Sequence, residues 1–171
     1  MDLNHPKVAP FTREVARALR LDPSFVEFVL ASEKPECMSY WCEEPTAGWA
    51  AWVPDEWEVA YPLWCTGSNP TVILCAGDTH VFAHTYHDSD FVNVVARTAQ
   101  GLLADLFVNL WENEVEDDPL RDAATACGFR YLDEVLRFEE EHNAAANYRE
   151  LLPAFIAHID ALDESTRAAL S

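Results

Sequence analysis

Residues 70–88 read PTVILCAGDTHVFAHTYHD, and they contain the clearest strand pair of the sequence. It contains two runs rich in β-branched and aromatic residues, 71–76 and 79–86, a composition typical of strands. Gly77 and Asp78 separate the runs and have the permissive backbone and side-chain chemistry that a two-residue turn requires. The stretch therefore predicts an antiparallel hairpin.

Neighbouring segments extend this hairpin into a sheet. An aromatic run at 57–65 ends at the turn sequence TGSN, residues 66–69, and a further short run follows at 91–96. Because consecutive strands joined by tight turns pair with each other, we expect a meander.

Helical patterns lie on both sides of the predicted sheet. Thr12 and Pro23 are start signals, and Gly128 is a stop signal. Apolar residues at helical spacing predict helices over 12–21, from 23 to before Pro35, and over 98–114, 119–127, 131–142 and 148–161.

This order of elements predicts an α+β fold. We expect a mostly antiparallel central sheet flanked by N-terminal helices and a long closing helix, with extra C-terminal helices. Residues 1–118 would form the α+β domain, and 119–171 a helical extension packed on that same domain.

Net charge restricts the function. The 171 residues include 30 Asp and Glu against 11 Lys and Arg, a net charge of −19, and residues 35–96 contain no Lys or Arg. Such a surplus disfavours direct binding to nucleic acid or an anionic membrane. A cationic protein is the partner that this charge favours.

Acidic and aromatic residues alternate in one part of the predicted sheet region. Aromatic anchors surrounded by complementary charge are typical of protein interfaces. The candidate partner contacts are Trp49, Trp52, Asp55, Glu56, Trp57, Glu58, Asp88 and Asp90.

Histidines make a metal site the first alternative to consider. His80, His84 and His87 precede Asp88 and Asp90, and all five are possible ligands. Because strand side chains alternate, His80 and His84 share one face and His87 points to the other. Strand and turn roles are therefore favoured, and we expect no metal and no cofactor.

Catalytic motifs give no support for an enzyme. The sequence has no G-x-S-x-G, no phosphate-binding G-x-x-x-x-G-K and no H-E-x-x-H. Adjacent acids such as Glu43 and Glu44 point in different directions, which disfavours a glycosidase pair. We expect a protein that is not an enzyme and has no catalytic residue.

Cysteine usage and the N-terminus indicate the compartment. Five cysteines at irregular spacing are typical of reduced thiols. Residues 1–11 lack the features of a signal peptide, and no window has the apolar length of a membrane span. We expect a soluble, cytoplasmic protein.

Three segments together resemble a known superfamily. They are PSFVEFVL at 23–30, the hairpin at 72–86, and ARTAQGLLADLFVNLWE at 96–112. Their order over about residues 21–114 resembles the SUKH immunity-protein superfamily (Smi/Knr-like), small α+β proteins of bacterial toxin systems. The resemblance implies direct, non-catalytic neutralisation of a cognate toxin, commonly a cationic nuclease, with the last helices as an extension.

Two other functions stay open from the sequence. One is an acidic phage protein that mimics DNA and inhibits a restriction or CRISPR nuclease. The other, less favoured, is an enzyme on an unrecognised fold. The oligomeric state is also open.

Overall fold

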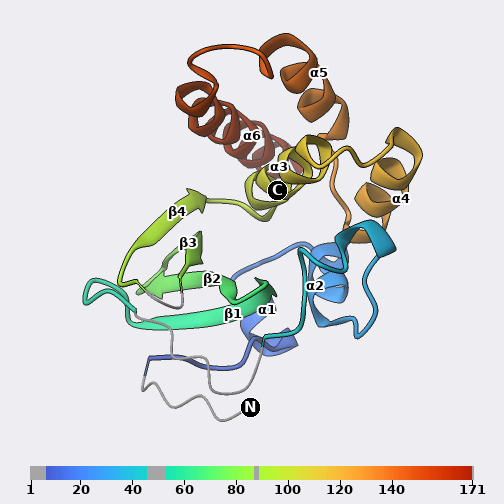
Figure 1. Ribbon diagram of the computed structural model, residues 1–171. Coiled ribbons are helices and arrows are strands. Elements are labelled where there is room, and N and C mark those ends of the chain that lie inside the picture. Colours follow the sequence, from blue (N-terminus) through green and yellow to red (C-terminus); the bar gives the residue numbers. More distant parts are fainter. Residues whose placement is uncertain (1–6, 46–52, 87–88, 171) are drawn as a thin grey trace.

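The computed structural model describes residues 7–45, 53–86 and 89–170 (Figure 1). The elements follow in the order helices, strands, helices, as the sequence predicts. They are α1 (Arg13–Ala18), α2 (Pro23–Leu30), the short 3-10 helix η1 (Glu36–Met38), β1 (Val59–Thr66), β2 (Asn69–Ala76), β3 (Thr79–Thr85), β4 (Val92–Ala96), α3 (Ala99–Glu112), α4 (Asp117–Cys127), α5 (Leu132–His142) and α6 (Tyr148–Leu170).

The strands form one antiparallel sheet in the order β1-β2-β3-β4. Ala76 pairs with Thr79 across the predicted turn, and Gly77 there has φ of +55°, a backbone conformation that favours glycine. The hairpin, the meander and the α+β class are confirmed.

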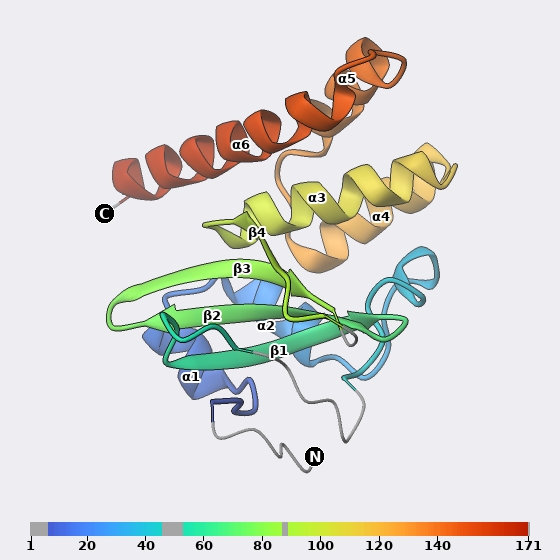
Figure 2. The same ribbon diagram turned by 60° about the vertical axis from the view of Figure 1, so that its left-hand side comes forward.

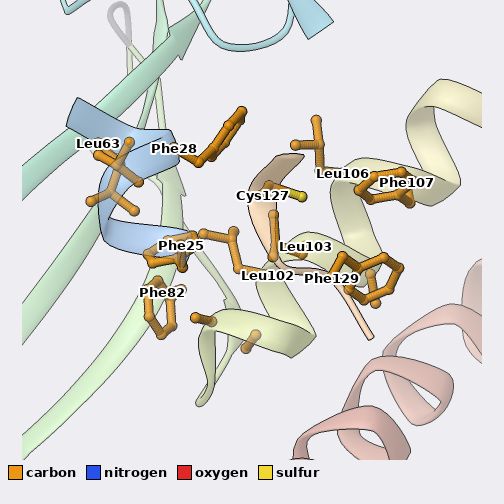
Figure 3. Packing of buried hydrophobic residues seen from close by; sticks show 14 of the residues in the cluster. Phe25, Phe28, Leu63, Phe82, Leu102, Leu103, Leu106, Phe107, Cys127 and Phe129 are labelled. Atoms are coloured by element: carbon orange, nitrogen blue, oxygen red, sulfur yellow. The ribbon is translucent and has the colours of Figure 1, made fainter. Parts of the chain in front are cut away.

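One face of the sheet carries the main core. Phe25 of α2 packs edge-on against Trp64 of β1 and Phe82 of β3, with ring centroids 6.3 and 6.1 Å apart. Leu102 and Leu103 of α3 are buried in the same cluster (Figure 3). Alternation along β2 sends Val72 and Leu74 to the opposite face, where a smaller cluster forms.

The C-terminal helices build a second layer on α3. Figure 2 shows α5 and α6 on the side of α3 that faces away from the sheet, while α4 lies beside α2. Buried Leu120 of α4, Val135 of α5 and Ile159 of α6 belong to the same cluster as Phe25 and Phe82. The helices after residue 118 therefore share the core of the sheet domain.

A buried carboxylate joins the two ends of this arrangement. Asp160 of α6 is 3% exposed and accepts hydrogen bonds from the backbone N–H of Arg97 at 2.8 Å and of Thr98 at 2.9 Å. It also accepts one from the Thr98 hydroxyl, and Thr98 Oγ1 in turn accepts from Gly101 N–H. Asp160 thus provides acceptors for the backbone N–H groups that lead into α3. Such donors at the start of a helix have no partner within the helix itself.

Replacement of Gly101 is expected to destabilise the fold because of this contact with Asp160. A Cβ atom at Gly101 would lie 2.2 Å from Asp160 Oδ1 and 2.9 Å from Ala96 Cβ. Gly101→Ala should therefore lower the free energy of unfolding by about 2–4 kcal/mol, measured by urea denaturation. A rise in stability, the usual effect of Gly→Ala inside a helix, would contradict this packing.

The last helix is longer than its apolar pattern predicts. The pattern ends near residue 161, whereas α6 continues to Leu170. Asp163 is fully buried and forms ion pairs with Arg130, which lies between α4 and α5, and with Arg167. The Nε atom of Arg167 lies 2.8 Å from Asp163 Oδ2. Ionic contacts, which apolar periodicity does not detect, thus accompany the extra turns.

Within residues 7–45, 53–86 and 89–170, no helix combines the length and the apolar character needed to cross a bilayer.

Candidate functional site

The structure places the sequence-predicted contacts at two ends of the sheet. Asp55, Glu56, Trp57 and Glu58 lie together just before β1, whereas Asp90 lies just before β4. Because neighbouring strands are antiparallel, the starts of β1 and β4 lie at opposite ends and opposite edges. The two groups are not brought together, and Trp49, Trp52 and Asp88 lie outside the described residues.

The group before β1 makes contacts within its own neighbourhood. Asp55 lies 3.7 Å from Lys7 Nζ, and Glu58 Oε2 accepts a hydrogen bond from Gly77 N–H at 3.3 Å. Trp57 is half-buried against the smaller cluster. Acidic side chains are therefore exposed here, but the tryptophan packs against the fold.

A pocket lies at the other end of the sheet, where β1 and β3 end. It has a volume of about 360 Å³ and separates this end of the sheet from α3. Figure 2 shows α3 running above the sheet. The lining residues are Trp41, Trp64, Thr66, Asn69, His84, Tyr86, Leu102, Asp105, Leu106, Val108, Asn109, Glu112 and Leu152.

A chain of hydrogen bonds fixes one carboxylate in this pocket. His84 Nε2 lies 3.0 Å from Asp105 Oδ2, and His84 Nδ1 lies 3.0 Å from Thr71 Oγ1. A neutral imidazole satisfies both contacts if Nε2–H donates to Asp105 and the Thr71 hydroxyl donates to Nδ1. The network therefore holds Asp105 in place without requiring a charged histidine.

The residue types of this network match a Thr-His-Asp triad, but the geometry does not suit catalysis. Both nitrogens of His84 are engaged by the hydroxyl and the carboxylate, as they are in a working triad, so the burial of the hydroxyl decides the question. Thr71 is 1% exposed, so its hydroxyl is shielded from a reactant. The arrangement can position a negative charge, whereas a triad must present a nucleophile.

Exposed aromatic rings stand on two sides of the pocket. Tyr40 is 60% exposed and packs on Trp41, with ring centroids 5.4 Å apart. Phe91 is 59% exposed, and its ring lies 5.8 Å from that of Tyr86. Trp41 and Tyr86 are lining residues, so each exposed ring continues the pocket wall onto the surface. Large exposed aromatic residues of this kind are typical of binding sites.

Negative charge surrounds the same pocket. Asp105 and Glu112 line it, and none of the lining residues is Lys or Arg. Exposed Glu43 lines a neighbouring pocket that also contains Lys34, and its backbone pairs with Cys65, next to the lining residue Thr66. Exposed Asp90 precedes Phe91. We call this region, with Tyr40, Trp41, Tyr86, Phe91 and the four acids, the pocket end.

Among the described residues, Asp90 is the one sequence-predicted contact at the pocket end. Asp105 and Glu112 escape sequence reasoning because they lie inside the pattern of α3 and meet the sheet only in the folded chain. The alternation of side chains along β3 does indicate that His84 faces α3, because Phe82 lies on the same face of the strand and belongs to the main core. That alternation is the signal that could have pointed to Asp105.

A further buried carboxylate lies near Glu112. Glu139 of α5 is fully buried, and the hydroxyl of Tyr148 donates to its Oε1 at 2.6 Å. Among the described residues, Glu139 Oε2 has no hydrogen-bond partner. Burial raises the pKa of Glu139, the Tyr148 hydrogen bond opposes that rise, and the nearby charge of Glu112 adds to it.

Glu139→Gln is expected to change how stability depends on pH. Because burial raises the pKa of Glu139 above its ordinary 4.5, this group stabilises the fold when protonated, and that contribution is lost as pH rises through the folded-state pKa. Glutamine cannot ionise, so the variant should be more stable by about 1 kcal/mol at pH 7, and the difference should disappear below pH 4.5. Urea denaturation at both pH values measures it; a difference independent of pH would contradict this prediction.

Metal binding has no support among the described residues, where no three His, Cys, Asp or Glu side chains cluster suitably. His80 and His84 share a strand face, as predicted, but His84 is engaged by Thr71 and Asp105. His87 lies outside the described residues.

Comparisons with known proteins find no matching protein-family model, no matching curated protein and no matching solved structure.

Proposed function

We propose that this chain is a non-catalytic binding protein that captures a cationic protein through the pocket end. The observation that carries the proposal is the coincidence of exposed aromatic rings and carboxylates around one pocket whose lining contains no Lys or Arg. The aromatic groups supply apolar contact area, and the acids supply attraction and orientation.

The charge of the whole chain supports the same proposal. Residues 35–96, which include the entire sheet, contain nine acids and no Lys or Arg. Self-repulsion among such groups destabilises the free protein, and a cationic partner relieves it. The long-range field also accelerates the encounter.

A more specific form of the proposal follows from the resemblance to SUKH immunity proteins. In that form the partner is a bacterial toxin domain, commonly a nuclease with a basic active site, and the complex forms in the cytoplasm. The carboxylates then occupy positions where the toxin binds phosphates. DNA mimicry by a phage inhibitor uses the same chemistry, so the identity of the partner separates the two.

Isolation of the partner tests this proposal. The tagged protein is purified from its native host, the captured protein is identified by mass spectrometry, and the complex is rebuilt from purified components. We expect a basic partner whose activity is suppressed at one equivalent of this protein. An acidic partner, or turnover of a small molecule by the isolated chain, would contradict the proposal.

A further inference from the structure

We infer that the pocket between the end of the sheet and α3 receives an arginine side chain of the captured protein. The inference rests on the proposed function and deepens it, because it assigns a chemical group to the pocket itself. Three properties of the pocket support it: a positioned carboxylate, aromatic walls, and a volume that suits a guanidinium group with part of its stem.

The carboxylate of Asp105 is held ready for a cation. Its side chain is only 16% exposed, and Oδ2 accepts from His84 at 3.0 Å and lies 3.5 Å from Asn109 Nδ2. Among the described residues, Oδ1 accepts no hydrogen bond. A partly buried carboxylate whose second oxygen accepts no hydrogen bond interacts more strongly with a cationic donor than a carboxylate in open water does.

The aromatic residues form walls against which a planar cation can stack. Trp41 and Tyr86 line the pocket and are supported by the exposed rings of Tyr40 and Phe91, whereas the lining residue Trp64 is 2% exposed and belongs to the main core. A guanidinium over an aromatic face is attracted by the ring quadrupole, and it sheds water more readily than an ammonium does.

The spacing of Asp105 and Glu112 along α3 allows a single guanidinium group to pair with only one of the two acids. Asp105 and Glu112 are seven residues apart on the same helix, which corresponds to roughly 10 Å along the axis. One guanidinium cannot pair fully with both. Asp105 therefore binds the arginine head group, and exposed Glu112 attracts a neighbouring cationic residue of the same partner.

NMR titration with a small probe tests this site apart from any protein partner. The probe is N-acetyl-arginine methylamide, and the comparison probes are the lysine and citrulline analogues, the latter a neutral mimic of arginine. We expect shifts centred on Trp41, His84, Tyr86 and Asp105, with the arginine probe bound more tightly than the lysine probe and the citrulline probe bound least.

Variants connect the shifts to the pocket. Asp105→Asn keeps an oxygen that can accept from His84 but removes the charge, and it should weaken binding of the arginine probe about tenfold or more. Glu112→Gln, an exposed position, should weaken it less. The matched control, Glu140→Gln at an exposed position of α5, removes one charge outside the pocket and should leave binding unchanged.

Three results would overturn the inference: shifts that spread over the acidic surface and are insensitive to Asp105→Asn, binding of the citrulline probe equal to that of the arginine probe, or no shift at pocket residues. Any of these, combined with capture of a basic protein by the intact chain, rejects the arginine site and leaves the proposed function standing. If the arginine probe still binds the pocket but the intact chain captures no basic protein, the proposed function is rejected and the arginine site stands.

Discussion

Replacing Asp160 with alanine is expected to lower the free energy of unfolding by about 3–5 kcal/mol. The variant leaves three donors at the start of α3 without their acceptor: the backbone N–H groups of Arg97 and Thr98 and the Thr98 hydroxyl. All lie where α6, α3 and the end of β4 meet, so water cannot readily replace the carboxylate. Urea denaturation followed by circular dichroism measures the loss.

Two neighbouring variants separate this bond network from a general effect on α6. Asp160→Asn retains one acceptor oxygen and should have an intermediate cost. Glu164→Ala removes an exposed carboxylate one turn later, 3.7 Å from Arg97, and should cost less than about 1 kcal/mol. Equal losses for Asp160→Ala and Glu164→Ala would show that α6 does not hold the start of α3.

Reversing the charge of the pocket end is expected to raise the Kd for the cationic partner at least about tenfold. The variant combines Glu43→Lys, Asp90→Lys and Glu112→Lys. All three side chains are exposed, and Glu112 lines the pocket while Glu43 and Asp90 lie next to residues of the pocket end. The substitutions therefore place like charges opposite the partner without removing a core residue. Calorimetry with the purified partner measures the Kd.

The chain offers a control with the same change in net charge. Asp55→Lys, Glu56→Lys and Glu58→Lys reverse three exposed acids at the other end of the sheet, all of them among the sequence-predicted partner contacts. We expect this control to weaken binding less than the pocket-end variant. A larger loss in the control would assign the interface to the residues before β1.

The sheet and most helices could be predicted from the sequence because their signals are local. The β-branched and aromatic runs of β2 and β3, the glycine turn at Gly77 and the helical stripe of α3 each arise from residues close together in the chain. The contacts that position the site are not local. Asp105 meets His84 across 21 residues, and Asp160 meets Thr98 across 62.

The candidate site illustrates the same limit. Sequence reasoning grouped Asp55, Glu56, Trp57 and Glu58 with Asp90 by composition, and the antiparallel sheet separates them. Charge could be predicted because it is a sum over the chain, whereas its concentration around one pocket depends on which strand ends meet. That position follows only from the order and direction of the strands.

The association rate between this protein and its isolated partner, measured over a range of ionic strength, tests the central claim most directly. If the carboxylates of the pocket end guide a cationic protein into place, the rate constant falls about tenfold or more from low to high salt. The dependence should also be weaker in the variant with Glu43, Asp90 and Glu112 reversed. A rate constant that does not change with salt would contradict the claim that these acids form a capture surface.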